Sequence, residues 1–212
     1  MLGKRQTLMV VISFMCSAIV LNFGIFKFPN DAQVLGYIMM IMPILELFIL
    51  IKFTSLRNGI VSSLLSWKGL VLLFSVTTIW EFILLIDLQG RQSIYYEMQI
   101  IYYPGFFEQV TFSMLGTEGL GLYFRRGTSL MISVLFYFSY YLMILLNSLS
   151  AYQGVFAPYF ILDIFGISSI YVACYGFSKS IYLAIIIQVS LLLLEYFIPP
   201  LPSAFFYTFV PS

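Results

Sequence analysis

Long apolar runs alternate with short polar segments along the whole chain. A transmembrane helix needs about 20 mostly apolar residues, and most of the runs have about this length. They predict about seven membrane-spanning helices, at residues 7–26, 33–53, 69–88, 100–124, 128–146, 155–175 and 181–198. The expected fold class is therefore all-α, a polytopic transmembrane helical bundle. Because no repeat or low-complexity linker divides the sequence, residues 1–212 are expected to form a single integral membrane domain.

The polar connections between these runs are short. Residues 54–68 are long enough to include a short helix at the membrane interface, and residues 89–99 form a polar loop. The tail, residues 199–212, is rich in Pro and Phe and is expected to lie along the outer interface or against a partner.

The basic residues predict the orientation of the bundle. Cytoplasmic loops of membrane proteins carry an excess of Lys and Arg. With the N-terminus in the cytoplasm and the C-terminus outside, Lys27 and Arg91 are the only two of the ten basic residues that fall outside. The eight residues expected inside are Lys4, Arg5, Lys52, Arg57, Lys68, Arg125, Arg126 and Lys179. The expected location is the plasma membrane.

The composition excludes several classes of function. The chain is 61% hydrophobic and 9% charged, whereas a soluble domain has about 25% charged residues. A net charge of +1 implies no bulk attraction for nucleic acid. The sequence has no His, which removes His metal sites and His-based catalysis. Cys16 and Cys174 match no metal or redox spacing, so no metal and no cofactor are expected, and the lipid bilayer is the first expected partner.

Acidic residues lie within the predicted spans, where a carboxylate is costly and is by default a candidate functional group. They are Glu46, Glu81, Glu108, Glu118 and Asp163. α-Helical geometry places them in two layers: Glu81, Glu108 and Asp163 lie roughly 10–12 Å from the outer surface, and Glu46 and Glu118 at a similar depth from the inner surface. Few basic residues are expected beside them, and burial favours the neutral carboxyl. Two interpretations stay open: a polar cavity for ions or acid-based catalysis, or hydrogen-bonded carboxyls that hold helices together.

Three segments in the C-terminal half match a family pattern, Glu-Glu-x-x-x-Arg followed by two His-containing helices. The first segment is Glu108-Gln109-Val110-Thr111-Phe112-Ser113. The second has Phe136 and then Tyr140 at the first His position. The third, YGFSKSIYLAIIIQ, ends with Gln188 at the second His position and has Lys179 where Gly is usual. Over residues 106–193 the chain thus resembles the CAAX prenyl protease and bacteriocin-processing family, also called the Abi family.

The resemblance implies a membrane scaffold whose active members are glutamate-dependent intramembrane endopeptidases. In that chemistry a carboxylate activates water, and His groups position it or stabilise the oxyanion. Here Gln109 replaces the second Glu, Ser113 replaces the Arg, and Tyr140 and Gln188 replace the two His. Because none of these can shuttle protons as imidazole does near neutral pH, we expect the scaffold without the protease chemistry. Glu108 is then expected to fix helix packing through Gln188, Tyr140 or a neighbouring span.

Three functions follow, and the first is favoured. It is a non-catalytic accessory or structural subunit of a larger membrane complex, with other membrane proteins as partners. The second is an intramembrane endopeptidase that uses Glu108 in a rearranged site, with Glu118 as a second acid. The third is an ion or proton-coupled transporter that uses the buried carboxylates, although no inverted repeat supports it.

Overall fold

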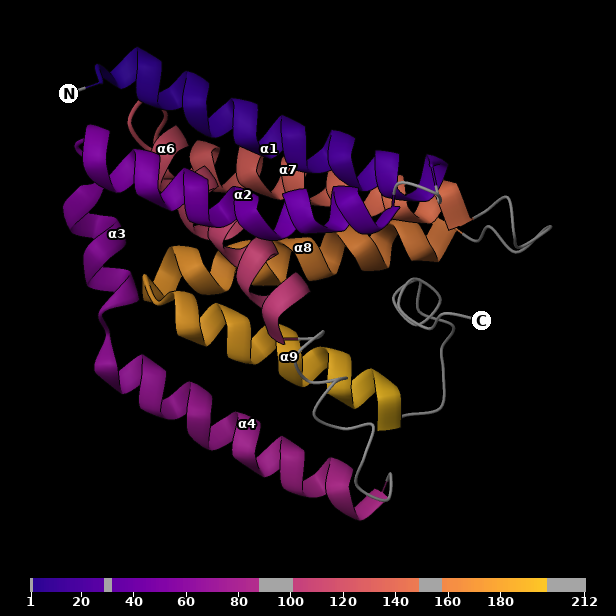
Figure 1. The fold of residues 1–212 in the computed structure, drawn as a ribbon. Coiled ribbons are helices and arrows are strands. Elements are labelled where there is room, and N and C mark those ends of the chain that lie inside the picture. The colour runs from indigo at the N-terminus through magenta and orange to yellow at the C-terminus, as the bar shows by residue number, and fades with distance from the viewer. Residues whose placement is uncertain (1, 29–31, 88–100, 149–157, 198–212) are drawn as a thin grey trace.

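The computed structural model describes residues 2–28, 32–87, 101–148 and 158–197, and within these ranges every regular element is a helix (Figure 1). The all-α expectation is therefore confirmed. In chain order the elements are α1 (Lys4–Lys27), α2 (Ala32–Phe53), α3 (Arg57–Leu64), α4 (Trp67–Asp87), η2 (Ile101–Leu115), α6 (Gly116–Leu120), α7 (Arg126–Ser148), α8 (Pro158–Ser178) and α9 (Ile181–Phe197). The predicted loop 89–99 and tail 199–212 lie wholly outside the described residues.

Each apolar run coincides with a helical segment, but few of these helices are long and apolar enough to be candidate membrane spans. Within the described residues, Lys4–Gly24 is the one helix long and apolar enough to span a bilayer, with a mean hydropathy of 2.0. Arg57–Leu64 and Trp67–Ile79 would pass the same test as one span, bent by 41° at the break. The chain thus has one clear span candidate, and the number of seven spans and their orientation stay predictions.

The π-helix η2 occupies the centre of the bundle. It packs against α1, α2, α7, α8 and α9, and all side chains at residues 107–117 are buried. Because η2 is buried on every side, its polar side chains face other helices: Glu108 accepts from Tyr137 of α7, and Thr111 donates to Glu46 of α2. By contrast, α4 lies at the edge of the bundle beside α9 (Figure 1).

The predicted helix at residues 100–124 is wrong in detail. The chain forms a π-helix over Ile101–Leu115, continues as the short α-helix Gly116–Leu120, and leaves helical structure at Gly121. In a π-helix each N–H bonds to the carbonyl five residues back, and such segments are often found at functional sites. The α-helical spacing that placed the acids by depth therefore does not hold in this element.

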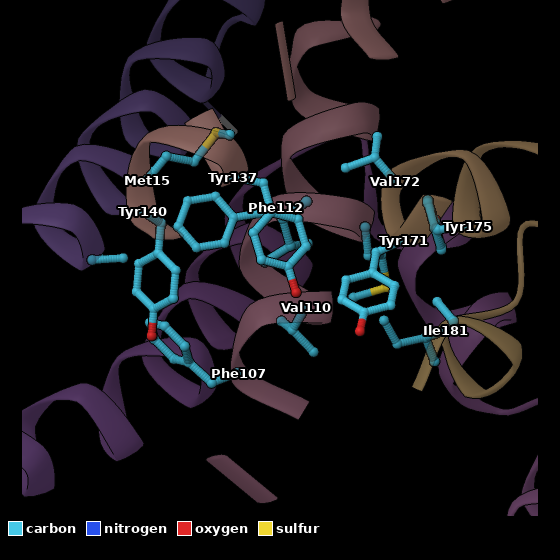
Figure 2. Packing of buried hydrophobic residues seen from close by; sticks show 14 of the residues in the cluster. Met15, Phe107, Val110, Phe112, Tyr137, Tyr140, Tyr171, Val172, Tyr175 and Ile181 are labelled. Carbon is cyan, nitrogen blue, oxygen red and sulfur yellow. The ribbon is translucent and has the colours of Figure 1, made fainter. Parts of the chain in front are cut away.

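Aromatic rings join η2 to the neighbouring helices. The rings of Phe112 and Tyr137 stack with centroids 5.0 Å apart, and Phe112 also packs against Tyr140 at 5.2 Å. Tyr171 of α8 approaches Tyr137 at 5.9 Å. Figure 2 shows these rings side by side in the core. Ring contacts of this kind add about 0.5–1.5 kcal/mol each beyond buried area, so the tyrosine face of α7 contributes to its packing against η2 and α8.

The basic residues that the sequence places in the cytoplasm gather at one end of the bundle. The N–H of Leu2 donates to the carbonyl of Phe53 at 2.7 Å, which joins the start of α1 to the end of α2. Arg126 Nη2 donates to the carbonyl of Gly176 at 2.7 Å, which joins the start of α7 to the end of α8. We call this the basic end; its basic residues, all exposed, are Lys4, Arg5, Lys52, Arg57, Lys68, Arg125, Arg126 and Lys179.

A close approach between α6 and α1 makes Gly119 sensitive to substitution. A Cβ at Gly119 would lie 2.6 Å from Val11 Cγ2, and Val11 is fully buried and stiff at χ1. Gly119→Ala is expected to lower the free energy of unfolding by about 1–3 kcal/mol, measured by unfolding in mild detergent. The control is Gly166→Ala, whose Cβ would meet nothing within 4 Å; an equal loss from both changes would contradict the close approach.

Candidate functional site

The carboxyl group of Glu108 lies at the junction of three helices. Its side chain is fully buried on η2. One oxygen, Oε2, accepts hydrogen bonds from the Tyr137 hydroxyl at 2.7 Å, from Gln188 Nε2 at 2.7 Å and from the Tyr141 hydroxyl. Because the two tyrosines belong to α7 and Gln188 to α9, this one oxygen ties η2 to both helices.

A second layer of contacts orients the donors. Gln109 Nε2 donates to Gln188 Oε1 at 2.7 Å, while Gln188 Nε2 donates to Glu108. The Gln188 amide therefore bridges two consecutive residues of η2. The hydroxyls of Tyr137 and Tyr141 lie 3.4 Å apart, and their rings stack at 5.0 Å. We call this set of five residues the Glu108 cluster.

The Glu108 cluster is arranged for an acceptor. Three donors on a single oxygen are typical of an ionised carboxylate or of a strongly polarised carboxyl group. Within the described residues the single ion pair joins Lys179 to Glu118 and includes no residue of the cluster, so hydrogen bonds and not a basic side chain stabilise this group. Glu108 Oε1 and Gln109 Oε1 are buried without a hydrogen-bond partner.

The structure brings together some of the residues that the family pattern singles out. Glu108, Gln109 and Gln188 lie in direct contact. Tyr140 also lies beside the Glu108 carboxyl. Its ring packs on Phe112, and its carbonyl accepts a hydrogen bond from Asn22 Nδ2 at 3.3 Å. Ser113 is buried nearby in sequence, but its hydroxyl has no hydrogen-bond partner and does not join the cluster.

Sequence reasoning missed the two tyrosines that bind Glu108. Tyr137 and Tyr141 are spaced by four residues, so they share one face of α7. Tyr140 lies about 100° around the helix from Tyr141. The signal that could have found the pair is this spacing of two tyrosines in an apolar helix, where a buried hydroxyl needs a partner.

Glu46 forms a second, smaller contact. Its side chain is fully buried on α2, and Oε2 accepts a hydrogen bond from the Thr111 hydroxyl of η2 at 3.1 Å. The other oxygen, Oε1, is buried without a partner. This contact links α2 to η2 in the way expected of a carboxyl that holds helices together.

Glu118 is not the deep acid that the sequence predicts. Its side chain is 22% exposed and forms an ion pair with Lys179 at 2.6 Å, and it also accepts a hydrogen bond from the Tyr175 hydroxyl at 3.2 Å. The reason is that the helix ends two residues later, at Leu120. The turn between α8 and α9 therefore reaches Glu118 at the basic end.

Glu81 and Asp163 are the two predicted buried acids that the structure does not describe. The side chains of Glu81 on α4 and Asp163 on α8 lie outside the described part of the structure. Among the residues whose side chains are described, no group of three or more His, Cys, Asp or Glu is placed to hold a metal ion.

No protein-family model, no curated protein and no solved structure matches the chain. The resemblance to the CAAX prenyl protease and bacteriocin-processing family therefore remains an expectation that rests on the sequence segments alone.

The turn between α8 and α9 allows a test of local backbone strain. Lys179 has φ 56°, a left-handed conformation that Gly adopts freely and that costs other residues about 1–2 kcal/mol. Lys179→Gly and Lys179→Ala both remove the ion pair with Glu118. We expect the Gly variant to be more stable than the Ala variant by about 1 kcal/mol in detergent unfolding; equal stabilities would contradict a strained backbone here.

Proposed function

We propose that this chain is a non-catalytic multi-pass membrane protein that acts as an accessory or structural subunit of a larger membrane assembly, on a scaffold resembling the CAAX-protease type. The observation that carries the proposal is the hydrogen bonding of Glu108. Its Oε2 accepts three side-chain donors from two other helices. This is the arrangement of a group that fixes helix packing.

The same geometry argues against Glu108 as a working general base. A general base must reach the proton it abstracts, directly or through one water. Tyr137, Tyr141 and Gln188 already use Oε2, and the whole side chain is buried. Of the groups that would position water or stabilise an oxyanion in the family pattern, the two His and the Arg are replaced here.

Exposed apolar surface supports a role in an assembly within the membrane. Large apolar side chains point outward along α2 and α4, among them Tyr37 at 57%, Phe48 at 57% and Phe74 at 65% exposure. A soluble monomer rarely leaves such stretches uncovered. In a bilayer, lipid tails or the helices of other subunits would cover them.

The test is to extract the full chain from membranes with mild detergent and to identify what co-purifies. The proposal expects one or more membrane proteins in fixed stoichiometry with the chain. A monodisperse chain that carries lipid but no protein would overturn the subunit role.

A second candidate is the glutamate-dependent endopeptidase, and the observation that favours it is the unpaired Glu108 Oε1. In this candidate function the oxygen binds and activates the attacking water. If the chain is an endopeptidase, Glu108→Gln abolishes cleavage of a membrane substrate. If it is a non-catalytic subunit, the same change leaves the cleavage of every membrane protein and peptide as it was.

A further inference from the structure

The short helix α3 lies across the basic end. Figure 1 shows it running across the ends of the long helices, between the end of α2 and the start of α4. Contacts with the start of α9 fix it there: the N–H of Ile181 donates to Ser63 Oγ at 3.2 Å, and the Tyr182 hydroxyl donates to the carbonyl of Leu64 at 2.5 Å. α3 is therefore held in place, and its own residue Ile60 is buried against the bundle.

Three basic residues surround α3, and none of them forms an ion pair with an acidic residue in the described part of the chain. Lys52 lies in the last turn of α2, Arg57 begins α3 and Lys68 lies at the start of α4. All three are exposed. The one ion pair among the described residues belongs to Lys179 and Glu118, so these three positive charges are not neutralised by a described carboxylate. An anionic partner would complement them.

Large apolar side chains lie between these charges. Leu65 is 74% exposed and Trp67 is 68% exposed, directly before Lys68. The ammonium of Lys52 lies 5.2 Å from the ring centre of Phe48 and 5.4 Å from that of Phe53. Aromatic rings at the level of the headgroups, with Lys and Arg reaching toward phosphate, are the pattern of a membrane interface.

We propose that Lys52, Arg57, Leu65, Trp67 and Lys68 form a surface that binds the anionic phospholipid headgroups of the inner leaflet. Each Lys or Arg near an anionic membrane surface is worth about 1 kcal/mol, and Leu65 and Trp67 enter the apolar region beside the headgroups. A soluble polyanion would engage the charges but would leave these two apolar side chains in water. This inference rests on the proposed membrane location.

The test uses the full chain purified in a neutral detergent and titrated with phosphatidylglycerol or phosphatidylcholine, with the midpoint of thermal unfolding as the readout. We expect phosphatidylglycerol to raise the midpoint at a lower concentration than phosphatidylcholine. The triple variant Lys52→Gln, Arg57→Gln, Lys68→Gln should need on the order of 100-fold more phosphatidylglycerol for the same shift. The control Lys52→Arg, Arg57→Lys, Lys68→Arg keeps the charges and should respond as the natural chain does.

Two further experiments distinguish a failure of the lipid-binding surface from a failure of the proposed membrane location. Glycerol phosphate and heparin replace the lipid to test a free anion and a soluble polyanion; an equal response to either would overturn the lipid-specific surface. Equal responses to the two phospholipids, or an unchanged response in the triple Gln variant, would also overturn it. If instead the chain is released from membranes by alkaline carbonate without detergent, the membrane location itself fails, and with it the proposed function.

Discussion

Replacing Glu108 by Ala is expected to lower the free energy of unfolding by about 3–5 kcal/mol, the largest loss of any single change considered for this chain. The change removes the acceptor for Tyr137, Tyr141 and Gln188 at once. Each buried donor left unpaired costs about 1–3 kcal/mol, and the vacated volume adds to the loss. Unfolding of the full chain in mild detergent, followed by the loss of helical signal, measures the effect.

Two controls make the Glu108 result specific. Glu108→Gln keeps one carbonyl oxygen as an acceptor and keeps the volume, so its loss should be less than half that of the Ala variant. Glu118→Ala makes the same substitution at a partly exposed ion pair, where about 1 kcal/mol or less is expected. Equal losses at the two glutamates would contradict the structural role of the Glu108 cluster.

Gln188→Leu is expected to have the second largest effect, a loss of about 2–4 kcal/mol. The Gln188 amide accepts a hydrogen bond from Gln109 and donates one to Glu108, both at 2.7 Å. Leu has a similar size, so packing is largely kept and the loss reports these two hydrogen bonds together with the longer one to the Tyr141 hydroxyl at 3.4 Å. Gln109 Nε2 would then retain only the Tyr137 hydroxyl, at 3.4 Å.

The same substitution, Gln to Leu, at an exposed position shows how much of the stability loss at Gln188 is due to burial. Gln6 lies in the first turn of α1, where its Oε1 accepts a hydrogen bond from the N–H of Gly3 at 2.9 Å in an exposed setting. Gln6→Leu should lower the free energy of unfolding by about 1 kcal/mol or less.

A double-mutant cycle between Gln188→Leu and Glu108→Gln should give a coupling energy of about 0.5–3 kcal/mol. A coupling energy of zero would mean that the Gln188 amide and the Glu108 carboxyl do not stabilise each other.

The helices could be predicted from the sequence because their signal is local. Runs of about 20 apolar residues set the length of each segment, and α1 (Lys4–Lys27) and α2 (Ala32–Phe53) begin and end within a few residues of the expected bounds. The gathering of basic residues at one end was also expected, since alternating helices return the chain to the same end after every second helix. These properties need no knowledge of which helices touch.

The Glu108 cluster could be predicted only in part. The family pattern singled out Glu108, Gln109 and Gln188, which do meet, but the pattern assumes α-helical spacing. The π-helix over Ile101–Leu115 changes which side chains of that segment share a face. On α7, Tyr137 and Tyr141 donate to Glu108 in addition to the expected approach of Tyr140. Composition and periodicity carry no signal for such a helix.

Contacts between residues far apart in the chain could not be predicted from the sequence, for a different reason. Glu118 and Lys179 are separated by 61 positions, and their ion pair depends on where α6 ends and on how the turn between α8 and α9 folds back. The same holds for Thr111 and Glu46, which are separated by 65 positions. Such pairs follow from tertiary packing, which a single sequence does not encode in any local pattern.

The most direct test of the central claim compares the membrane proteins and peptides of cells that carry the natural chain with those of cells that carry Glu108→Gln, at matched expression. If Glu108 holds helices together without catalysis, the two peptide profiles are the same and both chains capture the same partner proteins in the same stoichiometry. A membrane protein that accumulates uncleaved in the variant, together with the loss of its cleavage product, would show that Glu108 is catalytic and would contradict the account.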